Sequence, residues 1–321
     1  MILIYSKQKD EFVNDVIDCL MNYSFFRISQ GNGFVYVESV FKAHSENHSL
    51  IKNKFSEEID IQKITSIWFN GGAIDLNDSY KNNSSELNQL LFQNLNIIID
   101  GVLEAKKIKK IGNTKNNKKT NKIYNLLAAK NVGLQIPETL ITTSKEKLLR
   151  FIKTHNKFQF ICKRINESSN FIEKKYLFDN SKTFLLTKNE LEKLPDNFGL
   201  SFFQQRIKKK FEIRSIYFDN KFYSSAIFDN QDNVDYRVSL QNLDNKPRIV
   251  PYVLPKKIKK KLKSLLQILN YTYCSIDLLY TNDGRYVFLE INPCGQVGYI
   301  NSACNYYLEE EISKYLKNES K

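Results

Sequence analysis

The sequence has 321 residues, enough for two or three packed lobes rather than one ordinary core. Its 42% hydrophobic and 26% charged residues are typical of a globular protein, and no apolar run reaches the ~18–20 residues that a membrane helix requires. The net charge of +13 leaves nucleic acid, an anionic membrane face and an acidic protein substrate open as partners. The N-terminus lacks a signal-peptide pattern, and five scattered cysteines without a CxxC pair favour buried thiols, so we expect a cytoplasmic protein.

The first 111 residues predict an α/β lobe. Short apolar or alternating runs indicate strands, and apolar residues spaced three or four apart indicate helices. One strand ends at the turn signal Asn70-Gly71-Gly72, and Gly101 is a candidate break inside the last helix of this lobe. The expected elements are strands at 2–6, 33–40 and 64–69 and helices at 11–22 and 85–108.

A polar, basic and turn-rich stretch at 111–120 predicts the boundary to a second lobe. Gly133 is expected to stop the helix that follows, and Asp219-Asn220 to form the turn of a hairpin. The mixture of strands and helices favours an α/β or α+β protein of several lobes. The expected elements are helices at 121–134, 144–154 and 256–269, strands at 137–142, 158–164, 202–207, 212–218, 221–229, 273–280 and 286–291, and a C-terminal helix.

Residues 274–296, CSIDLLYTNDGRYVFLEINPCGQ, carry the most specific chemical pattern. Asp277 lies in one predicted strand, and Glu290 and Asn292 lie two apart in the next, so both are expected on one face together with Phe288. An apolar strand would not bury a glutamate and an asparagine without a partner. Two carboxylates and an amide oxygen are ligands suited to Mg²⁺. The alternative is a solvated hairpin whose polar residues meet only water.

This spacing resembles the metal-binding signature of the ATP-grasp superfamily. The resemblance implies a fold with an N-terminal lobe at 1–111, a central lobe at 112–204 and a C-terminal lobe at 205–321, with ATP held between the last two. It also implies ATP and Mg²⁺, expected as two ions, bound by Asp277, Glu290 and Asn292. By resemblance, the cofactor-binding residues are Lys163 at the end of FICK, Gln204, Gln205, Arg206, Ile207, Glu212 and Leu289, and the catalytic residues are Lys163, Arg214 and Arg237.

One segment departs from that family pattern. Many relatives have a glycine-rich loop after the phosphate lysine, where backbone amides cover the triphosphate. Here residues 166–170 read NESSN and contain no glycine. How this loop would close over the phosphates therefore stays open.

A narrower resemblance extends over residues 112–316. The segments QQRIKKKFEIRSIYF, VDYR, YVLP and FLEINPCGQVGYINSACNYYLEEEI are similar to those of graspetide, or microviridin-type, ligases. The ACNYYLE ending most resembles the branch associated with a radical-SAM SPASM partner. The resemblance implies a homodimeric ligase that forms ester or amide bonds between side chains of a precursor peptide with a leader and an acidic core. The leader is expected near 170–187 or on the hairpin at 213–229.

Simpler interpretations of these residues stay open at this point. Lys163 could be an ordinary strand-end lysine, Arg214 part of a solvated strand face, and Arg237 a surface arginine. Residues 208–210 could be a solvated turn, with Lys209 or Lys210 near ATP. For the whole protein, the alternatives are another ATP-grasp ligase with a different acceptor, or a non-enzymatic basic nucleic-acid-binding protein. The metal signature argues against nucleic acid, which we do not expect as a partner.

Overall fold

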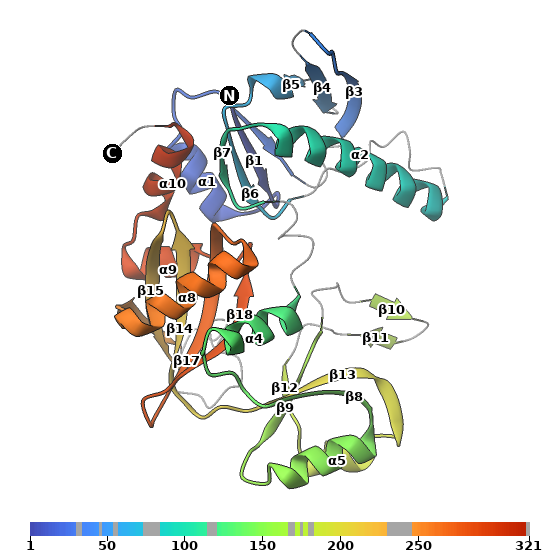
Figure 1. The fold of residues 1–321 in the computed structure, drawn as a ribbon, viewed down its shortest axis with the longest axis vertical. Coiled ribbons are helices and arrows are strands. Elements are labelled where there is room, and N and C mark those ends of the chain that lie inside the picture. Colours follow the sequence, from blue (N-terminus) through green and yellow to red (C-terminus); the bar gives the residue numbers. More distant parts are fainter. Residues whose placement is uncertain are drawn as a thin grey trace. The chain divides into compact units, whose positions relative to one another are not determined.

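The computed structural model (Figure 1) describes residues 1–29, 34–44, 47–53, 57–72, 84–113, 121–165, 171–173, 176–178, 183–229 and 246–318. The chain divides into two compact units. Unit 1 consists of Met1–Lys119, Tyr271–Cys274 and Pro293–Lys321, and unit 2 consists of Thr120–Asn270 and Ser275–Asn292. The expected mixture of helices and strands is confirmed, whereas the division into three lobes stays a prediction.

Unit 1 contains a parallel sheet in the order β2-β1-β6-β7. The side chains of each strand alternate between the two faces of the sheet, and helices cover both faces, as is usual for parallel sheets. A second, antiparallel sheet has the order β3-β4-β5. The bounds are β1 Ile2–Ser6, α1 Glu11–Asp18, β2 Phe25–Ile28, β3 Phe34–Val40, β4 His48–Asn53, β5 Glu58–Asp60, η1 Ile61–Lys63, β6 Ser66–Asn70, α2 Ser85–Ala105, β7 Lys109–Ile111, α9 Gly298–Cys304 and α10 Leu308–Leu316.

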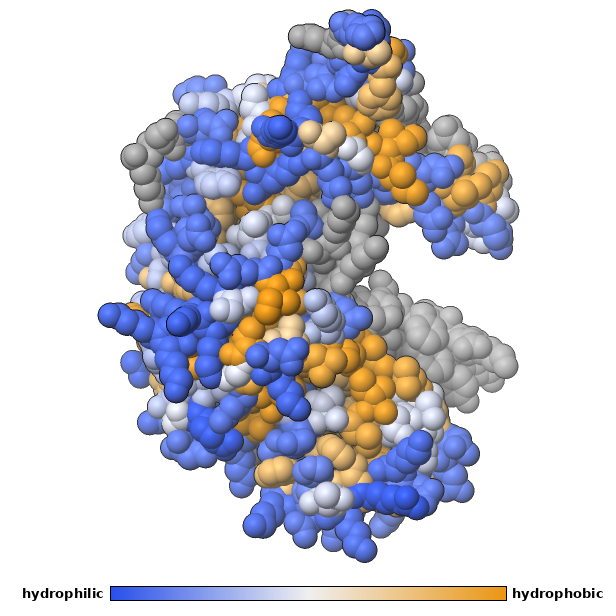
Figure 2. All heavy atoms as spheres, viewed as in Figure 1, coloured by the Kyte–Doolittle hydropathy of each residue, from blue (hydrophilic) through white to orange (hydrophobic). Residues whose placement is uncertain are grey.

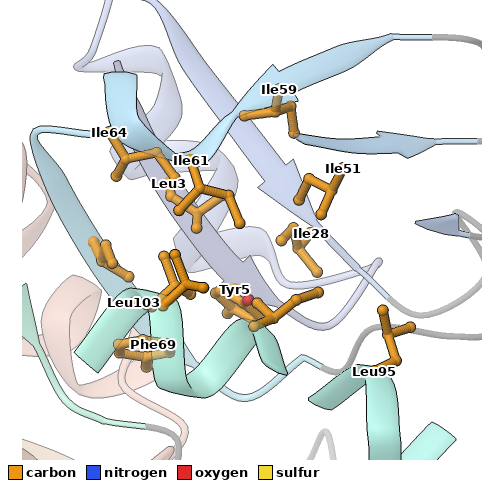
Figure 3. Close-up of a cluster of buried hydrophobic side chains, with 13 residues drawn as sticks. Leu3, Tyr5, Ile28, Ile51, Ile59, Ile61, Ile64, Phe69, Leu95 and Leu103 are labelled. Carbon is orange, nitrogen blue, oxygen red and sulfur yellow. The ribbon is translucent and has the colours of Figure 1, made fainter. Parts of the chain in front are cut away.

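One face of the parallel sheet packs against α2 (Figure 3). Leu3 and Tyr5 of β1 and Phe69 of β6 meet Leu95 and Leu103 of the helix in one buried cluster. Only the second half of α2 contributes residues to this cluster. The core of unit 1 therefore fixes the C-terminal half of the helix.

The other face of the sheet is covered by α1 and α10. Trp68 of β6 is fully buried there, edge-on to Phe12 of α1 and to Tyr273. Both ends of the chain are bonded at the start of β6: the nitrogen of Thr65 donates to the Met1 carbonyl (2.9 Å), and the Ser66 hydroxyl donates to the Leu316 carbonyl (2.7 Å). The last helix is thus part of the core built by the first strand.

Unit 2 contains two antiparallel sheets, in the orders β12-β9-β13-β8 and β16-β15-β14-β17-β18. Helix α4 packs against β18 and α8, and Gln135 extends the larger sheet by bridging to Val287 in parallel. The bounds are α4 Lys122–Asn131, β8 Thr139–Ser144, α5 Lys145–Thr154, β9 Phe160–Lys163, β10 Phe171–Glu173, β11 Tyr176–Phe178, β12 Phe184–Leu185, α6 Lys188–Lys193, β13 Asn197–Gln205, β14 Lys209–Phe218, β15 Lys221–Phe228, β16 Arg248–Tyr252, α8 Lys256–Leu269, β17 Tyr273–Thr281 and β18 Tyr286–Asn292.

Most predicted elements are present, with ends shifted by a few residues. The predicted hairpin turn is confirmed, since Asp219 and Asn220 both have positive φ. Gly101 does not divide α2, because Ile99 on one side and Val102 on the other are both held in the core. Within the described part of the chain, no helix combines the length and the apolar character needed to cross a membrane.

Candidate functional site

The three predicted metal ligands lie together on one face of the larger sheet of unit 2. Asp277 of β17 is directly opposite Glu290 of β18, and Asn292 lies opposite Ser275. The Asn292 side-chain nitrogen is 3.1 Å from Glu290 Oε1 and 3.5 Å from Asp277 Oδ2. Both carboxylates are largely buried, with exposed side-chain fractions of 18% for Asp277 and 20% for Glu290. A simply solvated hairpin does not describe this arrangement.

A β-bulge in β18 sets the direction of these side chains. Asp277 pairs with Glu290, but the next residue, Leu278, pairs with Phe288, so Leu289 is the extra residue. The prediction that Phe288 shares the face of Glu290 is therefore wrong. Phe288 points to the opposite face and is fully buried, while the bulge turns the carboxylate toward the site. The predicted cofactor residue Leu289 is partly buried at the bulge itself.

The donor set fits a hard divalent cation. Two carboxylates and one amide converge, and the amide nitrogen points at both carboxylates. Rotating the Asn292 amide by half a turn would present its oxygen to the same point and complete an all-oxygen set. Within the described residues, no group of three His, Cys, Asp or Glu side chains is placed to hold a metal, so the third member of this donor set is the amide.

Arg214 lies beside the acidic pair and is only 5% exposed. Its guanidinium is 3.5 Å from Asp277 Oδ2 and donates to the Ser275 hydroxyl at 3.1 Å. The interpretation of Arg214 as part of a solvated strand face therefore does not hold. Glu212, two residues earlier on the same face of β14, forms a largely buried ion pair with Lys209. A fixed guanidinium next to a carboxylate suits recognition of phosphate oxygens.

Two lysines from neighbouring elements add positive charge to the site. Lys122, the first residue of α4, has its amine 3.6 Å from Glu290 Oε2 and is 15% exposed. Lys163 ends β9, and its burial lowers the pKa of its amine, while the negative charge of Glu290 acts in the opposite direction. The site therefore combines two carboxylates with three cations. Such a set can hold a cation together with an anion that carries several charges.

The predicted cofactor-binding residues 204–207 lie at the end of β13 and in its connection to β14. The Gln204 side chain is buried and donates to the Thr139 hydroxyl at 3.2 Å. The backbone N–H groups of Gln205 and Arg206 donate to the carbonyls of Glu138 (2.8 Å) and Gln159 (2.7 Å). Both groups are thus already engaged within the smaller sheet and its loops. Ile207 follows them in the connection.

Sequence reasoning missed two residues of this site, and it named others that lie outside the described residues. Lys122 and Ser275 were not identified; a lysine at the first position of a helix that follows a basic loop was the one available signal. Arg237 and residues 166–170 lie outside the described residues. The other predicted residues all belong to unit 2.

Similar solved structures cover the whole chain. The macrocyclase MdnC bound with precursor peptide MdnA, from Microcystis aeruginosa MRC, matches with a TM-score of 0.81 at 22% identity over 100% of both chains. A RiPP-associated ATP-grasp ligase of Chryseobacterium gregarium, in complex with ADP and a leader and core peptide, gives 0.83 at 20% identity over 100% of this chain and 97% of that chain. The ATP-grasp ligase PsnB, complexed with a minimal precursor, Mg and ADP, gives 0.73 at 15% identity over 100% and 97%.

A more distant match is the D-Ala:D-Ser ligase VanG from Enterococcus faecalis, with a TM-score of 0.57 at 12% identity over 98% of this chain and 96% of that chain. No protein-family model and no curated protein matches the sequence. At these identities the likeness shows the fold. The chain has the fold of ATP-grasp ligases, as the sequence predicted.

Proposed function

We propose that this protein, built on the ATP-grasp fold, is an ATP-dependent ligase that crosslinks side chains of a ribosomally made precursor peptide. The observation that carries this proposal is the convergence of Asp277, Glu290 and Asn292 beside the buried Arg214. The peptide substrate is supported by the likeness to structures that contain precursor peptides.

The acidic set would hold Mg²⁺, as two ions, together with the phosphates of ATP. When bound, Mg²⁺ would neutralise phosphate charge and polarise the γ-phosphoryl group. Lys163, Lys122 and Arg214 would lie against the phosphate oxygens, where their charges oppose the negative charge that develops during transfer. Burial of Lys163 strengthens this effect, because a partly desolvated amine interacts more strongly with an anion than an exposed amine does.

The reaction would proceed in two steps. A substrate carboxylate oxygen attacks the γ-phosphorus, the bond to the β–γ bridging oxygen breaks, and ADP leaves with the electron pair. A hydroxyl or amine of the same peptide then attacks the acyl carbon, the bond to the phosphate oxygen breaks, and the attacking group loses its proton. Each crosslink removes the elements of one water from the peptide and consumes one ATP.

The remaining nucleotide contacts are assigned to the connection between β13 and β14 and to single residues of β14 and β18. Because the N–H groups of Gln205 and Arg206 are engaged, the N–H of Ile207 is the donor that we assign to the adenine edge. Leu289 at the bulge would contact the adenine ring. Glu212 would accept hydrogen bonds from the nucleotide, and Arg214 would contact phosphate or the acyl-phosphate. Arg237 keeps the catalytic role that the resemblance implies.

The expected peptide has a leader and an acidic core. The net charge of +13 would speed its encounter with the enzyme. We place the leader on the hairpin at 213–229 or near 170–187. The proposal also includes a co-encoded radical-SAM SPASM protein as partner, association of two copies of the chain and a cytoplasmic location. It assigns no role to nucleic acid.

A second candidate is a ligase that joins small molecules. The likeness to the D-Ala:D-Ser ligase VanG favours it, and the same site would serve a free amino acid as acceptor. The two candidates differ in their acceptor and in their dependence on a leader. A basic nucleic-acid-binding protein, in contrast, would need neither carboxylate of the site.

The test is mass spectrometry of the precursor encoded beside this gene, after incubation with the enzyme, ATP and Mg²⁺. We expect each bond to lower the peptide mass by that of one water, with one ADP released per bond, and a leaderless core to react poorly. Glu290→Gln should abolish the mass loss while Glu146→Gln, which changes an exposed carboxylate on α5, should not. A precursor of unchanged mass while the enzyme consumes ATP with free amino acids would favour the small-molecule ligase.

A separate test addresses nucleotide binding alone. ADP with Mg²⁺ at 100 times its dissociation constant should stabilise the native state by about 2.7 kcal/mol, because it binds only that state. Lys163→Ala should reduce the resulting shift in melting temperature. A wild-type protein that shows no shift at millimolar nucleotide would contradict the proposed site.

A further inference from the structure

Helix α8 presents a face of lysines to solvent. Its buried residues, Leu262, Leu265, Leu266 and Leu269, lie on one side of the helix. At 100° per residue, the exposed residues lie on the opposite side, within an arc of about 140°. This arc, the outer face of α8, consists of Lys256, Lys257, Lys260, Lys263, Gln267 and Ile268.

The distribution of charge along α8 is unfavourable for the helix itself. Lysines three and four residues apart repel one another. Lys256 and Lys257 lie at the positive end of the helix dipole, and the first turn has neither an acidic residue nor a side-chain cap. The last turn, where a basic residue would be favourable, has none. These choices cost helix stability, so they indicate a role for the charge outside the fold.

Neighbouring residues do not compensate this charge. No lysine of α8 forms an ion pair within the described part of the chain, and Lys261 donates to the Gly133 carbonyl instead. The sequence has no acidic residue between Asp244 and Asp277, whereas residues 256–263 contain six lysines in eight positions. The outer face of α8 therefore has uncompensated positive charge, which fits an anionic partner.

Apolar side chains border the lysines. Val253, three residues before Lys256, is 81% exposed, and Ile268 at the other end of the helix is 52% exposed. Helix α4 packs against α8 and exposes Tyr124 (54%) and Leu127 (53%). Where α8 lies in Figure 1, the surface in Figure 2 is hydrophilic, with apolar side chains beside it. Lysines bordered by exposed apolar and aromatic side chains are typical of surfaces that bind the headgroup region of a membrane.

Other anionic partners fit this face less well. Arginine is the preferred residue for nucleic-acid recognition, and α8 contains none. A peptide or a small anion binds in a groove, in a pocket or along a strand edge, whereas the outer face of a helix is convex. Separate point charges on lysines are sufficient for a surface that presents many anionic groups.

We propose that the outer face of α8, together with Val253, docks the protein on an anionic lipid membrane. The lysines would lie against the lipid phosphates, and Val253 and Ile268 would enter the interface at the two ends of the face. The cytoplasmic leaflet carries anionic lipids and is the surface that a cytoplasmic protein would meet. This property goes beyond the ligase reaction and does not depend on it, because no residue of the outer face belongs to the candidate site.

The first experiment is co-sedimentation with lipid vesicles in the absence of nucleotide. The wild type should bind vesicles of phosphatidylglycerol and phosphatidylcholine, but not vesicles of phosphatidylcholine alone, and the binding should weaken as salt is added. Lys256→Gln combined with Lys260→Gln should lower the partition coefficient about 25-fold, because each lysine near an anionic surface contributes a factor of about five.

The matched control is Lys147→Gln combined with Lys153→Gln, which removes the same charge from exposed positions of α5 in the same unit. It should bind vesicles as the wild type does. The α8 double variant should melt no earlier than the wild type, because it relieves repulsion between lysines, so its loss of binding would not reflect unfolding. Equal losses in the two double variants, or equal binding to charged and neutral vesicles, would overturn the proposal.

The second experiment distinguishes lipid from other anionic partners. Val253→Trp places a fluorescent reporter beside the outer face, and the single native tryptophan, Trp68, is fully buried and gives a constant background. Phosphatidylglycerol vesicles should shift the emission to the blue, whereas polyglutamate and duplex RNA should not, because only a membrane offers an apolar interior. Leu149→Trp on α5, at a position that is 44% exposed, should show no shift. An unchanged emission of Val253→Trp, or tighter binding to polyglutamate or RNA than to vesicles, contradicts docking on lipid.

Discussion

Replacing Asn292 by aspartate tests whether the acidic set of β17 and β18 is a cation site. In the structure, the Asn292 side-chain nitrogen donates toward Glu290 Oε1 at 3.1 Å and Asp277 Oδ2 at 3.5 Å. Asn292→Asp replaces that donor by an oxygen that carries negative charge and has nearly the same volume. Without a cation, three carboxylates would then lie close together in a largely buried position.

The size of the penalty can be bounded from these distances. Two unit charges 3.1 Å apart repel by about 5 kcal/mol at an effective dielectric constant of 20. The new carboxyl can instead bind a proton, which for a pKa near 3.9 costs only about 4 kcal/mol at pH 7 and about 1.5 kcal/mol at pH 5. We therefore expect the free energy of unfolding to fall by roughly 1–4 kcal/mol at pH 7, since Arg214 and Lys122 offset part of the repulsion.

The sign of the pH dependence follows from linkage. Repulsion raises the pKa of the new carboxyl in the folded state above its unfolded value. The penalty is therefore absent below pH ~3.9 and grows as pH rises through the raised pKa. The variant should be closest to the wild type at acidic pH and least stable, relative to it, at neutral pH.

Magnesium should reverse this penalty. In 10 mM Mg²⁺ and no nucleotide, the variant should gain more stability than the wild type, by about 4–8 °C in melting temperature if the extra gain is 2 kcal/mol. Asn292→Ala is the control, because it removes the amide without adding charge and should show no extra gain. A variant as stable as the wild type at pH 7, or an equal Mg²⁺ effect on both, would refute the cation site.

Three further predictions rest on single positions. Lys122→Met should weaken binding of ADP with Mg²⁺ by about 10–150-fold, the range expected for losing one hydrogen bond to a charged group, whereas Lys130→Met at the exposed end of the same helix should not; titration calorimetry distinguishes them. Burial lowers the pKa of Lys163, so the stability of the wild type relative to Lys163→Met should increase as pH rises through that lowered pKa toward ~10.4, as followed by urea unfolding. Gly72→Ala should cost about 1–3 kcal/mol, because its Cβ would lie 2.5 Å from a backbone nitrogen at the end of β1, while Gly199→Ala, with open space around it, should fold with wild-type stability in the same assay.

The sequence was sufficient to locate the acidic pair. A turn signal between two β-rich runs makes their strands neighbours, and residues two apart share a face. That reasoning brought Asp277, Glu290 and Asn292 together, and the register of β17 and β18 agrees with it. It failed for Phe288, because a bulge depends on how two strands pair. The alternation of apolar and polar residues within either strand does not reveal it.

Other parts of the site depend on contacts that a single sequence does not encode. Lys122 follows a basic stretch, where any lysine is consistent with a solvated helix start, and only the packing of α4 against β18 brings it to Glu290. Arg214 lies between Ile213 and Ser215 in a strand sequence that would equally fit an arginine on a solvated face. Its burial results from the sheet order that places β14 beside β17.

The bonds at the start of β6 have a consequence for engineering the chain. Thr65 binds the carbonyl of Met1, and its neighbour Ser66 binds that of Leu316, so the two ends of the described chain lie close together. A short linker could therefore join them, with new ends opened between Asn292 and Pro293. In such a circular permutant, unit 1 would become one continuous segment apart from Tyr271–Cys274, and unit 2 would follow it.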